Sequence, residues 1–176
     1  MGKGRRQAVK IAYESRKEII ALMEPEKVSY VSEIINTVKP IIDGKAELVI
    51  PKRKSLISYP VVQQHSEALV NFFVKELTGL ILDISFGPRT FKRELSNYFL
   101  NYSGEYGDTW DSIFIPVLNA IHDKKSILSL DVNYIHPKEQ TEFEEHDIKF
   151  FKKRVSLQLC ELTEILEKHW IKLKNK

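Results

Sequence analysis

The stretch AIHDKKS, residues 120–126, places a histidine beside an aspartate where an apolar run ends. Imidazole and carboxylate groups are common ligands of divalent metal ions, so His122 and Asp123 could form half of a metal site. The same pair also suits the end of a helix, because a histidine in the last turn interacts favourably with the helix dipole. The pattern leaves both interpretations open.

Two segments resemble the metal-binding helices of HD-type phosphohydrolases. These are HSEALVNFFVKELTG, residues 65–79, and VLNAIHDKK, residues 117–125. The resemblance implies metal-dependent activation of water for attack on a phosphate ester. It implies the metal ligands His65, His122, Asp123 and Asp147. In an alternative interpretation, His65 simply lies on the buried face of a helix, three residues after one apolar position and four before the next.

Clusters of basic side chains indicate another kind of chemistry, contact with the phosphates of a nucleic acid. The formal net charge of +3 is modest for a dedicated nucleic-acid binder, and runs of charge often form only a solvated face. We therefore expect nucleic-acid contact as a secondary possibility. The residues expected to make it are Lys52, Arg53, Lys54, Arg89, Lys92 and Arg93.

The composition limits the class of protein. A chain of 176 residues that is 43% hydrophobic can bury roughly 70% of its unfolded surface, so we expect one folded domain over residues 1–176. The single cysteine, Cys160, excludes an internal disulfide and fits a reducing, cytoplasmic compartment. Charged residues interrupt the longest apolar-rich segment, residues 61–82, which argues against a membrane span.

The hydrophobic periodicity predicts a mainly α fold, a bundle of about six helices with apolar residues three or four positions apart. Two segments, ELVI (47–50) and ILSLDV (127–132), have the character of strands. We expect them to pair as a small two-stranded accessory that rests on the helices. The expected helices span about residues 5–23, 26–39, 60–83, 88–102, 108–122 and 138–173.

The expected C-terminal helix, about residues 138–173, is the clearest element. Its apolar stripe repeats at 11 residues, which is close to the period of a straight helix. At 1.5 Å per residue it would be roughly 50 Å long, longer than a compact domain of this size, so we expect it to overhang. The stripe contains Ile148, Phe151, Val155, Leu159, Leu162, Leu166, Trp170 and Leu173.

The sequence therefore predicts a non-enzymatic interaction or regulatory module that acts through this long amphipathic helix. An overhanging helix would offer its apolar side chains to a protein partner or to a second copy of the chain. The HD-type phosphohydrolase is the alternative, and a divalent metal ion is expected only under that alternative. The residues expected to form the interaction surface are Phe151, Val155, Leu166, Trp170 and Leu173.

Overall fold

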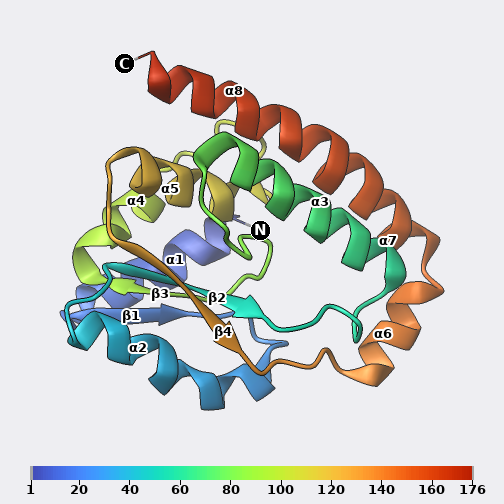
Figure 1. Ribbon diagram of the computed structural model, residues 1–176, viewed down its shortest axis with the longest axis horizontal. Coiled ribbons are helices and arrows are strands. Elements are labelled where there is room, and N and C mark those ends of the chain that lie inside the picture. The colour runs from blue at the N-terminus through green and yellow to red at the C-terminus, as the bar shows by residue number, and fades with distance from the viewer. Residues whose placement is uncertain (1, 176) are drawn as a thin grey trace.

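A computed structural model of the chain, which describes residues 2–175, has an α/β architecture built on a four-stranded mixed sheet (Figure 1). The expectation of a mainly α bundle with a two-stranded accessory is therefore wrong, although 58% of the structure is helical. Helix α2 packs against one face of the sheet, and the helices of the large hydrophobic core lie on the other.

The sheet has the strand order β1-β3-β2-β4. Its strands are β1 (Ile19–Leu22), β2 (Leu48–Arg53), β3 (Arg89–Lys92) and β4 (Ile127–Val132). Strand β3 is antiparallel to both of its neighbours, whereas β2 and β4 are parallel. Strands β1, β2 and β4 therefore run in the same direction, and their carboxyl ends lie at one edge of the sheet, toward α6 (Figure 1).

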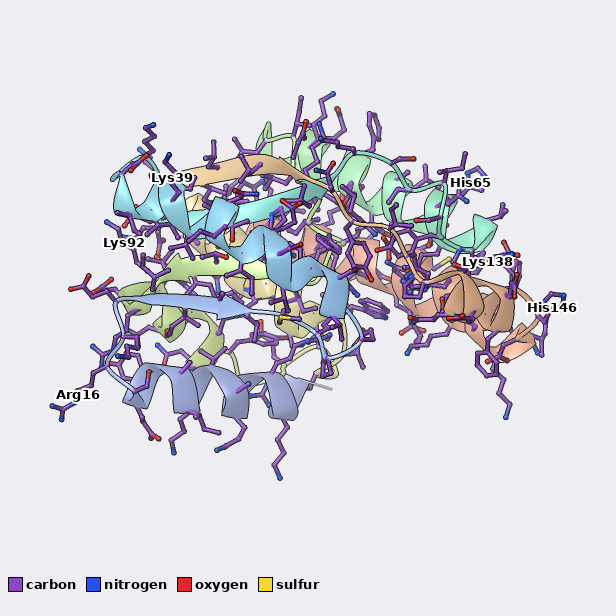
Figure 2. The ribbon with its side chains drawn as sticks, turned by 90° about the horizontal axis from the view of Figure 1, so that it is seen from below. Arg16, Lys39, His65, Lys92, Lys138 and His146 are labelled. Atoms are coloured by element: carbon purple, nitrogen blue, oxygen red, sulfur yellow. The ribbon has the colours of Figure 1, made fainter. Side chains whose placement is uncertain are left out.

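The expected pairing of the two predicted strands is confirmed, since residues 48–53 pair in parallel with residues 127–132. The other two strands replace parts of expected helices. The first helix ends at Glu14, and Arg16 adopts a positive φ of 59° before the chain turns back into β1 (Figure 2). The segment Arg89–Lys92 forms β3 because its β-favouring Thr90 and Phe91 pair with both neighbouring strands.

The helices fill both sides of the sheet. The α-helices are α1 (Gly2–Glu14), α2 (Ile34–Ile42), α3 (Val61–Thr78), α4 (Ser96–Leu100), α5 (Asp111–His122), α6 (Lys138–Glu145), α7 (Ile148–Lys153) and α8 (Leu162–Lys174). Two 3₁₀ segments, η1 (Val28–Glu33) and η2 (Arg93–Leu95), and a π-helical segment, η3 (Arg154–Glu161), complete the structure. Fully buried Val70 of α3, Phe114 of α5 and Leu166 of α8 belong to the same core.

The C-terminal segment differs from the single helix expected over residues 138–173. Helix α6 ends at Glu145, and α7 starts after Asp147, whose carboxylate accepts the backbone N–H of Lys149 as a helix cap. From there α7, η3 and α8 continue to Lys174 and pack on α3 and α5. The expectation that this segment overhangs the domain is therefore wrong, because the helical run lies along α3 and the core (Figure 1).

The π-helical segment changes which side of the C-terminal run is buried. Arg154, Gln158, Leu162 and Leu166 are four residues apart, and all are buried. In a regular α-helix each such step drifts by about 40°, so Arg154 and Leu166 would lie about 120° apart. The wider π turns take up this difference. As a result two polar residues face inward, whereas Phe151 stays 50% exposed.

Candidate functional site

The carboxyl edge of the sheet adjoins a polar cavity of about 80 Å³. Arg53 is the last residue of β2, Glu24 follows β1 by two residues, and His136 follows β4 by four. Ser85, which lines the same cavity, belongs to the segment that leads into β3. In open α/β sheets, ligands bind in the crevice outside the carboxyl ends of the strands, so the position itself is one that binding sites use.

A buried network of charged groups forms the floor of the cavity. Arg53 donates from Nε and Nη2 to the two carboxylate oxygens of Asp83, at 2.7 Å each, and its Nη2 lies 2.7 Å from Glu67 Oε2. Arg154 donates to Glu67 Oε1 at 3.0 Å and to Gln158 Oε1 at 2.8 Å. Burial opposes ionisation of Asp83, but the hydrogen bonds from Arg53 hold the pKa of Asp83 below its ordinary value. The network joins β2, α3 and η3.

Several side chains around the cavity carry polar atoms that have no hydrogen-bond partner within residues 2–175. We call four of these atoms the unpaired cluster: Gln63 Oε1, Ser85 Oγ, Trp110 Nε1 and His136 Nδ1. Gln63, Ser85 and His136 are only 5%, 7% and 4% exposed. A buried polar group without a partner costs about 1–3 kcal/mol, and native proteins hold few of them. The four atoms lie around one cavity, so a single bound molecule can supply partners to all of them.

His136 is held rigidly in this cavity. Its Nε2 lies 3.2 Å from Glu144 Oε2, and its ring stacks on Tyr59 with the ring centroids 4.2 Å apart. Its backbone N–H donates to Ser58 Oγ at 2.9 Å. Burial opposes ionisation of Glu144, but the hydrogen bond from His136 keeps the pKa of Glu144 below its ordinary value. In a neutral His136 ring, the carboxylate acceptor at Nε2 favours the proton on that nitrogen, which leaves Nδ1 as an acceptor.

A larger hollow of about 580 Å³ adjoins the cavity and shares lining residues with it. The shared residues are Glu24, Glu26, Trp110, Glu144 and Arg154. The guanidinium of Arg154 lies 4.9 Å from the ring centroid of Trp110 and 4.8 Å from that of Phe150. Lys153 Nζ lies 5.7 Å from the Trp110 ring. The hollow thus combines aromatic walls with cationic groups.

The hollow also contains carboxylates. Glu24 accepts from Arg5 at 3.2 Å and lies 2.7 Å from Lys27 Nζ. Burial opposes its ionisation, but the attraction of Lys27 and Arg5 holds the pKa of Glu24 below its ordinary value. Glu26, half exposed, lies 3.5 Å from Lys27 Nζ. Both signs of charge therefore line the hollow, which suits a ligand with both donors and acceptors better than a simple anion.

The residues of the predicted metal site lie in separate places. His65 lines a surface groove between α3 and α7, whereas His122 and Asp123 line a hollow at the end of α5 together with His169. Asp147 caps α7. Over the described part of the chain, no group of three or more His, Cys, Asp or Glu side chains is arranged to hold a metal ion.

The end of α5 at His122 agrees with the helix-end interpretation of AIHDKKS. There, Asp123 accepts from Tyr98 Oη at 2.7 Å and lies 3.2 Å from His122 Nδ1. The HD-type assignment stays a prediction, and the positions of its expected ligands add no support to it.

The basic residues predicted to contact nucleic acid do not form one surface. Arg53 is buried in the network described above, and the fully buried Arg89 guanidinium donates to the backbone carbonyls of Ile84, Phe86 and Pro88. Arg93 packs on the Tyr13 ring at 4.0 Å. Lys52 and Lys54 are exposed near the carboxyl edge, whereas Lys92 lies at the end of the molecule far from His65 (Figure 2).

Sequence reasoning missed most of the site. It did not single out Gln63, Glu67, Asp83, Ser85, Trp110, His136, Glu144 or Arg154 as functional. One signal in the sequence could have pointed to the site. Glu67 lies three residues before Val70 on α3, so the two side chains share the buried face of that helix. A charged residue on an apolar helix face is expensive to bury unless it has a partner.

No protein-family model matches the chain, and no curated protein is similar to it, so the function is inferred from geometry alone. Among the residues described, no helix is long and apolar enough to cross a lipid bilayer.

Proposed function

We propose that the chain binds a small polar ligand in the cavity at the carboxyl edge of the sheet. The observation that carries this proposal is the unpaired cluster, in which buried donors and acceptors from α3, from the residue before α5 and from two loops meet at one cavity. Each would gain a partner from a ligand that offers both donors and acceptors. The adjoining hollow gives such a ligand a route to solvent and additional room, within the range typical of small-molecule sites.

Thermal-shift titration of the purified chain tests this proposal, with nucleotides, sugars, sugar phosphates and amino acids as the probes at millimolar concentration. We expect at least one probe to raise the melting temperature of wild type. Ser85→Ala, which removes one atom of the unpaired cluster, should reduce that rise. Ser103→Ala is the matched control, because Ser103 is exposed and lies outside the cavity. The proposal fails if no probe shifts wild type, or if both variants respond equally.

We propose, as a second candidate, the interaction function expected from the C-terminal helix, restricted to its first half and with a second copy of the chain as the partner. Leu166, Trp170 and Leu173 are buried in the core and would not contribute. Phe151 and Val155, 50% and 37% exposed, line an apolar groove between α3 and η3. Apolar side chains exposed side by side on one face are a feature of interaction sites.

The charges around the groove favour a second copy as the occupant. Glu144 and Glu145 line one end of the groove, and Lys75 lies over the exposed Phe72 ring further along α3, at 5.4 Å. Antiparallel two-fold pairing of this face would bring the acidic end of one copy to the lysine of the other.

Sedimentation velocity over a concentration series tests self-association. Wild type should dimerise, Phe151→Glu should stay monomeric, and Ile42→Glu should behave as wild type, because Ile42 is 69% exposed on α2, away from the groove. A monomeric wild type at every concentration would exclude the second candidate without affecting the first.

A further inference from the structure

We infer that the ligand of the cavity is a mononucleotide, with the edge of its base in the inner cavity and its phosphate beside Lys153 in the adjoining hollow. This inference rests on the proposed ligand-binding function and names the class of ligand. It follows from three features of the site: the mixture of donors and acceptors, the aromatic walls and an exposed lysine in the hollow outside the inner cavity.

The unpaired cluster matches the edge of a heterocyclic base. Trp110 Nε1 can only donate, Gln63 Oε1 can only accept, and Ser85 Oγ can do either. His136 Nδ1 accepts when its Nε2 proton is shared with Glu144. A carboxylate or a fully ionised phosphate monoester offers acceptors alone, so it would leave Gln63 and His136 unsatisfied. A nucleobase edge presents ring acceptors and amino or imino donors side by side.

The walls of the site suit a planar ring. Tyr59, Phe86 and His136 all line the cavity; the Tyr59 and His136 rings stack on each other, and the Arg53 guanidinium lies 4.8 Å from the Tyr59 centroid and 4.9 Å from the Phe86 centroid. Trp110 stands where the cavity meets the hollow. Aromatic side chains stack on bases with a gain that is insensitive to base identity.

The charged groups of the hollow suit the rest of a nucleotide. Lys153 is exposed and forms no ion pair within the described residues, so its ammonium is available to a phosphate. Glu24 and Glu26 supply carboxylate oxygens of the kind that accept hydrogen bonds from ribose hydroxyls. Lys153 lines the hollow but not the inner cavity, which places a cation at the outer end of the site, where the anionic end of the ligand would lie.

A single nucleotide fits better than a polynucleotide. Two of the three arginines of the predicted nucleic-acid surface, Arg53 and Arg89, are buried and paired inside the fold. The basic residues therefore do not line an extended track along which successive phosphates of a strand would run.

Calorimetric titration of the full chain tests the inference, with AMP, GMP, CMP and UMP, the corresponding nucleosides, and inorganic phosphate as probes. At least one nucleotide should bind, its nucleoside should bind about tenfold or more weakly, and phosphate alone should not bind. Lys153→Glu should weaken the nucleotide about tenfold and leave the nucleoside unchanged. Lys152→Glu is the control, since Lys152 is exposed and does not line the hollow.

The outcomes separate this inference from the proposal on which it rests. The mononucleotide inference is overturned if no nucleotide binds. It is also overturned if a nucleotide binds Lys153→Glu as tightly as it binds wild type. If another probe of the thermal-shift panel then raises the melting temperature of wild type by more than that of Ser85→Ala, the ligand-binding function stands with a different ligand. If no probe stabilises wild type, both are overturned.

Discussion

Replacement of Ser85 by alanine tests whether the unpaired cluster is kept for a ligand at the expense of stability. Ser85 is 7% exposed, and its Oγ has no partner in the described structure, while its backbone N–H donates to Asn71 Oδ1 at 3.0 Å. Alanine keeps that backbone bond and removes only the hydroxyl. Because an unpaired buried hydroxyl costs about 1–3 kcal/mol, the ligand-free variant should be more stable than wild type.

We expect a gain in unfolding free energy of about 1 kcal/mol, the lower end of that range. For a chain of this length, 1 kcal/mol corresponds to a rise in melting temperature of about 2–4 °C. Urea denaturation gives the free energy, and differential scanning calorimetry gives the melting temperature. The control Ser103→Ala should change the unfolding free energy by no more than about 0.5 kcal/mol.

The substitution Ser85→Ala should raise the stability of the ligand-free chain but lower the stabilisation that added ligand gives. The ligand-free variant should be more stable, while its stabilisation by added ligand should be smaller, as expected for a polar group retained for function. Destabilisation of ligand-free Ser85→Ala by about 1 kcal/mol or more would refute the reasoning, because it would mean that the hydroxyl is hydrogen-bonded within the folded protein.

Three further predictions concern the surroundings of the site. Arg154→Met should destabilise the chain by about 3–5 kcal/mol in urea denaturation, because Glu67 loses one cation of a buried network; a loss below about 1 kcal/mol would contradict that network. The folded pKa of Glu24 lies below its ordinary 4.5, so its contribution to stability is present above that pH and lost as pH falls through the folded pKa. The melting temperature should therefore fall less steeply below pH 4.5 in Glu24→Gln than in wild type, and equal slopes would contradict the ion pairs of Glu24. Leu166→Ala should cost about 2–5 kcal/mol and Phe151→Ala much less, since the first is fully buried and the second half exposed; equal losses in urea denaturation would contradict the observed packing of the C-terminal run.

The strands that the sequence revealed are those with strong local patterns. ILSLDV alternates apolar and polar residues, and ELVI is a short apolar run, so both were found and correctly paired. Strands β1 and β3 have four residues each, and their apolar residues fit the spacing of the neighbouring helices. Their strand character comes from pairing with each other across more than sixty residues of sequence, which a local pattern does not record.

In the C-terminal run, the spacing of apolar residues predicted the helix but not which of its faces is buried. The 11-residue repeat correctly located an amphipathic helix, but a repeat assumes the same turn throughout. The π-helical segment shifts the buried side by one residue, from Val155 to Arg154 and from Leu159 to Gln158. Arg154 and Gln158 became buried partners of α3, and only the first half of the apolar stripe, including Phe151 and Val155, lies at the surface groove.

The candidate site was hidden because its residues come from distant segments. Gln63, Ser85 and His136 each look ordinary in sequence, and only the meeting of strand ends with α3 and α5 brings them around one cavity. Their significance lies in the absence of partners within the described structure, a property that exists only after the chain has folded.

Whether the cavity is a ligand site is decided by a crystal structure of the chain with the probe that most raises its melting temperature. We expect the probe to occupy the cavity at the carboxyl edge of the sheet, within hydrogen-bond distance of at least two of Gln63 Oε1, Ser85 Oγ and His136 Nδ1. A probe bound elsewhere, with these three atoms hydrogen-bonded to other groups of the protein, would contradict it.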